Sequence, residues 1–412
     1  MNCRPCAAAG VCGRGRVDMK PAIIIPSYWA GTEAETMAPG AYDHTTDLQS
    51  SSPELDRCLA SLEQVHRLPR IFVLLVCPLS ATHDVRMRVE KILAAHPRLD
   101  TVLVTNQEAS RVMERVAQIA PHALGEGVSL RGYGAIRNMG LAVASIFCHD
   151  SVIFLDDDEV VGDPNFMDRA LYGLNQETRQ RLPILVKSGY YFDAQGSALA
   201  SSDPGDATQK WWTKRVEFNA WMSKALSGTR ISRSNYLCGG CMALHARAFT
   251  RIAFDPFITR GEDLDYLFNM RLFGLDVWFD NSWAVRHLPP AGCEGASRFM
   301  QNVYRWYYER AKLAAASRLN EYSPVTPASL MPYPGPWISS ELDERVRKTS
   351  IARMVATDER SAYARIWRSG REDAERYARQ NAGKYLKFQS FWPSIMNGLW
   401  NDTELRGILE RR

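Results

Sequence analysis

The 412-residue sequence lacks several features that would place it in a specialised class of protein. No apolar stretch approaches the roughly 18 to 20 residues needed to span a bilayer, so we expect no membrane-spanning helix. Neither sign of charge dominates, because 50 basic and 46 acidic residues leave a net charge of +4, which does not indicate nucleic-acid binding. The N-terminus has arginines but no apolar run, which argues against a secretory signal. A hydrophobic content of 46% favours an ordinary globular core.

The nine cysteines form no complete metal-binding pattern. Cys238 and Cys241 have a spacing found in zinc and redox sites, and so do Cys3 and Cys6 with Cys12 nearby. Each set lacks the matching second half of a zinc site. The odd count and the lack of a secretion signal favour a cytoplasmic location, with peripheral contact at the inner face of the membrane left open.

Three segments are expected along the chain. Residues 1–18 are rich in Gly and Arg and lack periodicity, so we predict a disordered or artefactual extension, with Met19 as an alternative start. Residues 19–295 are predicted to form the catalytic domain. Residues 296–412 are predicted to be a helical extension that docks on that domain, forms an oligomer interface or touches a membrane surface. The oligomeric state cannot be read from this pattern.

Buried strands alternate with amphipathic helices in the first half of the sequence. Continuous apolar runs, as in strands covered on both sides, occur at Ala22–Pro26, Ile71–Cys77, Thr101–Val104 and Val152–Leu155. Helical spacing of apolar residues occurs at 54–66, 84–95, 109–120 and 134–147. This order predicts an α/β fold with a mixed, mainly parallel sheet flanked by helices.

The second half is less regular. A strand is predicted at Ile184–Phe192 and a short one at Asp276–Phe279, while residues 193–235 form an insertion without a motif. This insertion holds Trp211, Trp212 and Trp221, whose rings could stack on sugars or pack in the core.

The most informative motif is a run of acids at the end of a predicted strand. Asp156, Asp157 and Asp158 directly follow Leu155. Adjacent carboxylates repel one another, so their burial is unfavourable unless they share a cation. Mg²⁺ and Mn²⁺ accept oxygen ligands and keep positions open for a substrate phosphate. The motif therefore predicts a metal site for a phosphorylated or nucleotide-bearing substrate, whereas a solvated acidic turn is the inert alternative.

Three later features support the metal hypothesis. Arg137 follows a glycine-rich turn and could offer a planar donor fork to a diphosphate. Glu262, Asp263 and Asp265 cluster at the start of a predicted helix, where a carboxylate could deprotonate an acceptor hydroxyl or simply complement the helix dipole. His287 follows a short apolar run and is a candidate metal ligand.

In this order, the segments resemble the family 2-like nucleotide-sugar glycosyltransferases of the GT-A fold, a Rossmann-like nucleotide-diphospho-sugar transferase fold. The resemblance covers about residues 20–290. The matching segments are Ala22-Ile-Ile-Ile-Pro-Ser27, Gly134-Ala-Ile-Arg-Asn-Met-Gly-Leu141, Phe154-Leu-Asp-Asp-Asp158, Gly239-Gly-Cys-Met-Ala-Leu244 and Gly261-Glu-Asp-Leu-Asp-Tyr266.

The resemblance implies roles for individual residues at the metal and the catalytic base. Asp158 would be the main ligand of Mn²⁺ or Mg²⁺, with His287 completing the protein ligands. Asp156 would help to hold the metal or contact the nucleoside. Asp263, with Glu262 beside it, would act as the base if the reaction inverts the anomeric centre.

The resemblance also implies a set of donor-binding residues. Pro26 and Ser27 would lie near the base and ribose. Arg137, Asp157 and Gly240 would face the rest of the nucleotide-diphosphate-sugar.

The implied activity is metal-dependent transfer of a sugar from a nucleotide-diphosphate-sugar to an acceptor hydroxyl, of the hexosyltransferase type, in glycan or cell-surface polysaccharide assembly. The acceptor could be a carbohydrate, a lipid or a polyol. One alternative is a sugar-nucleotidyltransferase, which would need basic residues directly after the first strand, where Ser27-Tyr-Trp-Ala-Gly31 has none. The other is a non-catalytic nucleotide-binding protein of the same fold.

Overall fold

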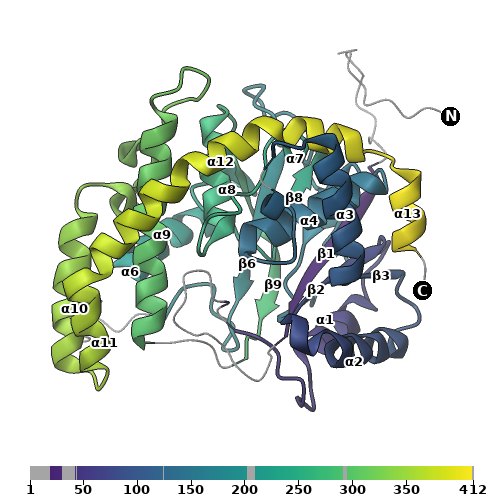
Figure 1. Ribbon diagram of the computed structural model, residues 1–412, viewed down its shortest axis with the longest axis horizontal. Coiled ribbons are helices and arrows are strands. Elements are labelled where there is room, and N and C mark those ends of the chain that lie inside the picture. Colours follow the sequence, from purple (N-terminus) through teal and green to yellow (C-terminus); the bar gives the residue numbers. More distant parts are fainter. Residues whose placement is uncertain are drawn as a thin grey trace.

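The computed structural model describes residues 19–29, 42, 44–123, 125–201, 209–290 and 295–410. The extension expected at 1–18 lies outside this part of the chain. A mixed sheet forms the centre of the described molecule, and helices cover both of its faces (Figure 1). The α/β class, with a mainly parallel sheet and a helical C-terminal region, is confirmed.

The sheet combines a parallel half with a mixed half. Strands β3, β2, β1 and β4 lie side by side and parallel, and the order continues through β8, β6, β9 and β5, with β7 paired to β9. Strands β8, β5 and β7 run against their neighbours. The bounds are β1 (Pro21–Tyr28), β2 (Ile71–Val76), β3 (Thr101–Val104), β4 (Ser151–Phe154), β5 (Glu159–Val160), β6 (Val186–Phe192), β7 (Ile231–Arg233), β8 (Met242–His245) and β9 (Trp278–His287).

Two apolar clusters lie on opposite faces of the sheet. The first half supplies α1 (Glu54–Leu62), α2 (Thr82–Ala95), α3 (Asn106–Ile119), α4 (Tyr133–Ile146) and α5 (Phe166–Leu171). Helices α3 and α4 pack in the larger cluster, whereas α1, α2 and α5 pack in the smaller one on the other face. Alternate residues of β1 follow this division: Ile24 joins the first cluster, and Ile23 and Ile25 join the second.

The region after β6 departs from the sequence-based expectation. Helix α6 (Lys214–Leu226) and β7 lie in the insertion 193–235, where no regular element was predicted. Strand β9 runs to His287, beyond the predicted strand at 276–279. The reason is a polar stretch inside β9: Asp280 is fully buried and accepts a hydrogen bond from Lys187 Nζ at 2.7 Å. That partner lies on β6 and could not be assigned from local pattern.

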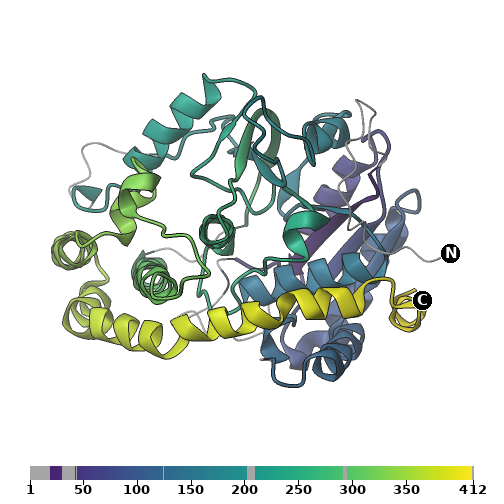
Figure 2. The same ribbon diagram turned by 90° about the horizontal axis from the view of Figure 1, so that it is seen from above.

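Helices α7 (Ala246–Phe249) and α8 (Glu262–Leu272) follow β8 in the chain. The C-terminal helices are α9 (Gly295–Ala316), α10 (Leu342–Ala356), α11 (Arg360–Arg365), α12 (Arg371–Leu399) and α13 (Thr403–Leu409). Short helical turns elsewhere in the chain are Leu79–Ala81, Gly125–Gly127, Pro327–Leu330, Gly335–Ile338 and Ile366–Gly370. Helix α12 crosses the molecule from α9 to α3 and α4 (Figure 2). Directly after α13, Glu410 pairs with Arg70 at 2.7 Å.

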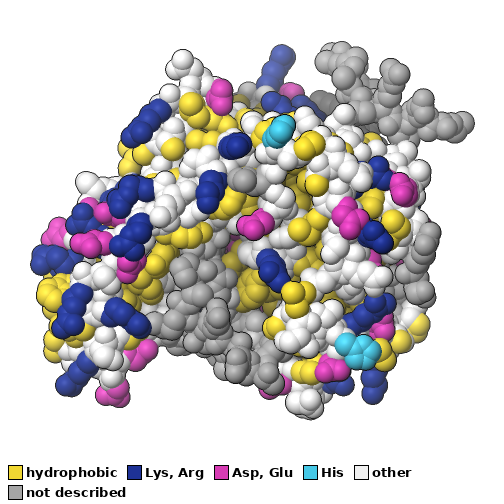
Figure 3. Space-filling view, viewed as in Figure 1, with side chains coloured by type: hydrophobic (Ala, Val, Ile, Leu, Met, Phe, Trp, Pro, Cys, Tyr) yellow, Lys and Arg dark blue, Asp and Glu magenta, His cyan; other side chains and the backbone are white. Residues whose placement is uncertain are grey.

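The outer surface of these helices is polar. Figure 3 shows basic and acidic side chains interspersed on the left of the view, over the C-terminal helices. No helix in the described part of the chain has the length and apolar character that crossing a membrane requires. The larger apolar cluster includes buried residues of α9, α10 and α12, so the C-terminal helices dock on the rest of the protein. The predicted boundary near residue 295 stays a prediction.

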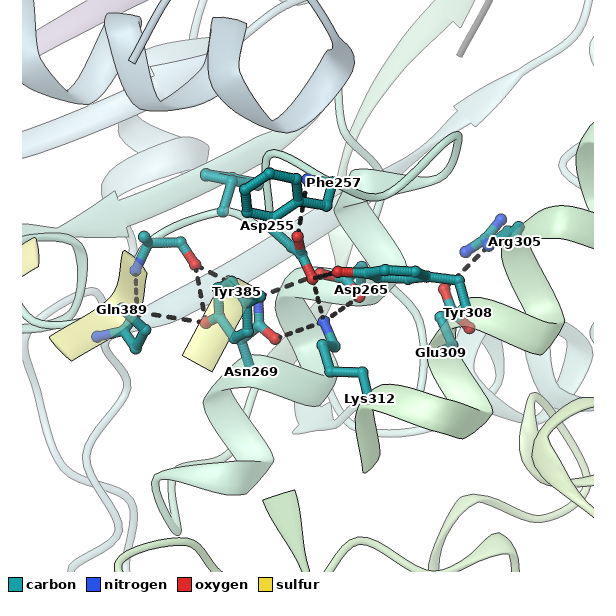
Figure 4. Close-up of polar contacts among 12 residues, drawn as sticks. Asp255, Phe257, Asp265, Asn269, Arg305, Tyr308, Glu309, Lys312, Tyr385 and Gln389 are labelled. Atoms are coloured by element: carbon teal, nitrogen blue, oxygen red, sulfur yellow. Dashed lines mark hydrogen bonds and ion pairs between the residues drawn. The ribbon is translucent and has the colours of Figure 1, made fainter. Parts of the chain in front are cut away.

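A buried charge cluster joins α8, α9 and α12 (Figure 4). Lys312 of α9 is fully buried and donates hydrogen bonds to Asp265 and, at 2.9 Å, to Asn269 of α8. Its Nζ also lies 3.1 Å from Asp255 Oδ2 and 4.6 Å from the ring centre of Tyr385 on α12. Burial alone would lower the pKa of Lys312, but Asp265 and Asp255 outweigh it and raise that pKa, so the lysine stays charged.

We predict that Lys312→Met lowers the free energy of unfolding by about 3–5 kcal/mol, because it leaves two buried carboxylates without their cation. Urea denaturation at neutral pH measures the change. The matched control is Lys387→Met at an exposed position of α12, which should shift stability by no more than about 0.5 kcal/mol. Equal effects of the two substitutions would contradict the structural role of Lys312.

Candidate active site

A cleft of about 530 Å³ opens at the edge of the sheet where β1, β4 and β9 end. These strands run in the same direction, so their carboxyl ends meet there, which is where ligands bind in open α/β sheets. One wall comes from the strand ends and the start of α8. Residues of α6, α9 and α10 also line the cleft. The predicted residues on the first wall are Arg137, Asp156, Asp157, Asp158, Gly240, Glu262, Asp263 and His287.

The acids after β4 take separate partners. Asp156 accepts a hydrogen bond from Arg137 Nη2 at 2.7 Å. Asp157 accepts from Ser27 Oγ at 2.7 Å and from the Tyr28 amide at 3.2 Å. Burial, together with the charge of Asp158, raises the pKa of Asp157 well above its ordinary value. Asp157 therefore acts as a buried support for β1, with little carboxylate surface in the cleft.

Asp158 forms a group with two histidines. Its Oδ2 lies 3.1 Å from His287 Nε2 and 3.5 Å from His44 Nε2. Burial acts to raise the pKa of Asp158, but the hydrogen bond from His287 and the nearby charges of both histidines hold that pKa below its ordinary value. The pKa of His287 is raised, because its contact with Asp158 outweighs the lowering effect of burial.

The donor set of this group suits a divalent transition metal. The ligand atoms of His44, Asp158 and His287 all lie within 4.8 Å of one another. Two imidazoles with one carboxylate favour Mn²⁺ over Mg²⁺, since Mg²⁺ prefers oxygen ligands. Asp156 is not part of this group, because its carboxylate is held by Arg137. The metal role implied for Asp156 stays a prediction.

Arg137 links the end of β4 to the start of α8. Its side chain is only 3% exposed, and besides Asp156 it donates from Nε to Glu262 Oε1 at 3.1 Å. Its remaining terminal nitrogen, Nη1, is buried and has no hydrogen-bond partner among the described residues. A buried donor without a partner is unfavourable, so Nη1 is a natural contact for an anionic ligand in the cleft.

Helix α8 presents Glu262 and Asp263 to the cleft and Asp265 away from it. Gly261 precedes the helix with φ of 70°, a left-handed conformation that glycine adopts without strain. The Leu264 amide donates to Asp263 Oδ1 at 2.6 Å, which orients that carboxylate. Asp265 lies two residues after Asp263, about 200° further round the helix, and binds Lys312 on the side away from the cleft. The dipole alone therefore does not explain all three acids.

The Gly239-Gly240 segment leaves room for the side chains of Arg137 and Glu159. A Cβ at Gly239 would lie 2.9 Å from Arg137 Nη2, and one at Gly240 would collide with the Glu159 carboxylate. Cys238 and Cys241, on either side, are buried free thiols whose pKa values burial raises well above the ordinary range. Neither belongs to a metal-binding group in the described part of the chain. Cys3, Cys6 and Cys12 lie outside that part.

Two predicted donor-binding residues lie behind the cleft surface. Pro26 is in the buried part of β1, and Ser27 is fully buried against Asp157. Neither lines the cleft, so any influence on a nucleotide passes through their neighbours, and the roles implied for them stay predictions.

Sequence reasoning missed His44 and an aromatic cluster. Tyr28, Tyr42 and Tyr133 line the cleft with ring centres 4.8 to 6.0 Å apart. The signals were weak: Tyr28 stands two residues after the predicted strand Ala22–Pro26, and Tyr133 lies in the glycine-rich segment where α4 begins. Nothing in the polar loop around His44 distinguished that residue from a solvent-exposed histidine.

The tryptophans of the insertion have different environments. Trp221 packs in the larger core cluster against Tyr236 and Phe279, as the core interpretation proposed. Trp212 lines the cleft but is 9% exposed and packs edge-on against Trp337, so it also belongs to the core. The ring of Trp211 lies 4.0 Å from Lys348 Nζ.

Residues 69–309 match the family described as Glycosyltransferase like family 2. No curated protein matches the sequence.

Three solved structures show distant likeness. They are a mycobacterial protein (14% identity, 71% of this chain and 75% of that chain, TM-score 0.39), GalNAc-T7 with UDP, GalNAc and Mn²⁺ (13%, 74% and 52%, 0.39) and mouse xyloside xylosyltransferase 1 in its apo form (13%, 56% and 68%, 0.28). The chain spans about half the length of GalNAc-T7. At these scores the likeness carries no argument about ligands.

Burial raises the pKa of Glu262 to about 7, against the opposing charge of Arg137 and with the added repulsion of Asp263. Because this pKa lies above the ordinary 4.5, the folded protein binds the proton more tightly than the unfolded chain does. Stability from this group is present below pH 4.5 and is lost as pH rises towards 7. We predict that Glu262→Gln gains stability relative to the native protein over that interval, by about 1–3 kcal/mol.

Urea denaturation at several pH values between 5 and 8 measures this difference, with Glu114→Gln at an exposed site of α3 as control. A difference that does not change with pH would contradict the raised pKa.

We predict that Mn²⁺ alone raises the melting temperature of the protein and that His44→Ala weakens this binding by at least about tenfold, because a ligand is lost. The readout is thermal unfolding across a Mn²⁺ titration. His122→Ala, which changes an exposed histidine, should leave the titration unchanged. Equal Mn²⁺ binding by both variants would remove His44 from the proposed ligand set.

Proposed function

The chain belongs to glycosyltransferase-like family 2, and we propose that it transfers a sugar from a nucleotide-diphosphate-sugar to an acceptor hydroxyl with Mn²⁺ as cofactor. The observation that carries the proposal is the convergence of Asp158, His287 and His44 in a cleft that Arg137 also lines, with Nη1 of that arginine unpartnered among the described residues. A two-histidine metal group and a cationic donor in one cleft suit a diphosphate.

Different residues at the strand ends would bind different parts of the donor. Asp158, His287 and His44 would hold the metal, which when bound would offset the negative charge on the departing diphosphate. Arg137 would donate from Nη1 to the same anionic group, and its hydrogen bonds to Asp156 and Glu262 fix its direction. The rings of Tyr28, Tyr42 and Tyr133 supply an aromatic surface on which a nucleobase can stack.

Asp263 is proposed as the general base of an inverting reaction. The acceptor oxygen forms a bond to the anomeric carbon, and the bond from that carbon to the diphosphate oxygen breaks. Its electron pair leaves with the nucleoside diphosphate, and the hydroxyl proton passes to Asp263. The hexosyltransferase class, a role in glycan assembly and the cytoplasmic location expected from the cysteine count stay predictions.

The test is thermal unfolding with UDP, GDP, CMP and dTDP, each with and without Mn²⁺. We predict that one nucleotide raises the melting temperature only with Mn²⁺, by an amount equivalent to about 2.7 kcal/mol at 100 times the dissociation constant. Asp158→Ala should abolish this shift, and Asp84→Ala, at an exposed position of α2, should preserve it. Stabilisation by no nucleotide with metal would overturn the proposal and favour a protein of the same fold without donor binding.

We further predict that Asp263→Asn retains the metal-dependent nucleotide shift but loses at least about a hundredfold in transfer rate, since the amide cannot accept the hydroxyl proton. The rate is measured as nucleoside diphosphate release with the nucleotide-sugar whose base the thermal test selects. Unchanged transfer would exclude Asp263 as the base and leave a retaining reaction.

A further inference from the structure

The metal group is assembled from three segments that lie far apart in the sequence. Its ligand atoms belong to His44, Asp158 and His287 and lie within 4.8 Å of one another. The sheet links two of these segments, because Glu159 of β5 pairs with His287 of β9. His44 lies outside the helices and strands, so the sheet alone does not fix its distance from the other two ligands.

One face of α1 contacts all three segments. Four of its residues stand at positions i, i+3, i+4 and i+7, which lie on one side of a helix; they are Glu54, Arg57, Cys58 and Ser61. Each of these side chains makes a polar contact with a residue outside α1, and every contacted residue lies close to a ligand along the chain. Helix α1 is therefore a common neighbour of the whole metal group.

Arg57 contacts the segment that carries His287. Its Nη2 donates to the Leu288 carbonyl at 2.8 Å, and Leu288 directly follows the histidine. The Leu288 amide donates in turn to the Asp158 carbonyl at 2.9 Å. Both backbone polar groups of Leu288 are thus held, which limits the directions in which the neighbouring imidazole can point.

Cys58 and Ser61 contact the backbone on either side of Asp158. The Cys58 thiol donates to the Asp156 carbonyl at 3.7 Å, a weak hydrogen bond, and Ser61 Oγ accepts from the Val161 amide at 3.0 Å. Both side chains are buried. Because one contact precedes Asp158 in the chain and the other follows it, together they hold the backbone that carries the central ligand.

Glu54 contacts the segment that carries His44. Thr46 Oγ1 donates to Glu54 Oε2 at 2.7 Å, and the two residues are only 3% and 8% exposed. The Thr46 amide also donates to the Tyr28 carbonyl at 2.7 Å. Breaking the side-chain contact would leave a buried carboxylate unsatisfied, which is unfavourable. The chain is therefore fixed to α1 two residues after His44.

We propose that the polar face of α1 sets the geometry of the Mn²⁺ site, with Arg57 as a positioning residue for His287 and Glu54 as one for His44. Neither side chain belongs to the metal-binding group found in the described part of the chain, so each acts through the segment that it holds. This inference rests on the proposed function, since it concerns the metal of that function, and it identifies the part of the fold on which metal affinity depends.

The experiment is titration of the protein with Mn²⁺ alone, followed by the electron paramagnetic resonance signal of the free ion. This measurement gives the dissociation constant for Mn²⁺ and needs no donor, acceptor or turnover. We expect Arg57→Met and Glu54→Ala each to weaken Mn²⁺ binding by about 10- to 100-fold, as is typical when a residue that orients a metal ligand is lost.

Two further variants separate positioning from a general loss of packing. Arg406 of α13 is also half-buried, and its Nη2 donates to the Ile146 carbonyl at 3.0 Å, so Arg406→Met removes a matched contact and should leave Mn²⁺ binding unchanged. Glu54→Gln keeps a side-chain oxygen that can accept from Thr46 and should restore most of the binding lost in Glu54→Ala. Melting temperatures without metal show which variants are folded, and either Arg57→Met or Glu54→Ala alone can test the proposal if the other does not fold.

The outcomes separate the two proposals. A native dissociation constant for Mn²⁺ in Arg57→Met or in Glu54→Ala overturns the role of that residue and leaves the proposed function standing. Equal weakening in Arg406→Met overturns the role of α1, because any loss of stability would then weaken metal binding. Failure of the native protein to bind Mn²⁺ overturns the metal group of the proposed function, and the role of α1 fails with it.

Discussion

The contact of Lys312 with two buried aspartates determines how the two parts of the chain fit together. The lysine lies on α9, Asp255 lies in the segment before α8, and Asp265 lies in α8 itself. The ion cluster therefore fixes the position of α8, whose first turn carries Glu262 and Asp263. Tyr308 donates to the same Asp255 carboxylate at 2.9 Å, and Tyr385 of α12 covers the lysine. The C-terminal helices are thus part of what positions the acids of the cleft.

The run of acids at the end of β4 is compatible with folding because each carboxylate meets a different environment. Asp156 has a guanidinium, Asp157 has a hydroxyl and an amide, and Asp158 has two imidazoles. For Glu159, burial raises the pKa well above its ordinary value, which favours its neutral form over a further buried charge. Because each carboxylate has its own partners, Asp158 stays ionised at the cleft and can bind a cation there.

The sequence predicted the sheet centre and the acidic wall because both are local patterns. Continuous apolar runs identify β1, β2, β3 and β4, and the residues that end them reach one edge by the geometry of parallel strands. His44 and the tyrosine cluster depend on contacts between distant segments. His44 is 114 positions from Asp158 in the chain, a difference of residue numbers that no periodicity encodes. For the same reason the contact of Asp265 with Lys312 could not be predicted, and Asp265 was interpreted as an acid that complements the helix dipole.

The placement of α12 has a consequence for motion. With 29 residues the helix is about 43 Å long, and it contacts α9, which lines the cleft, and also α3 and α4, which pack against the sheet. Because α12 packs against both sides, hinge opening of one half against the other would have to break its packing at one end. The width of the cleft is therefore set when the chain folds.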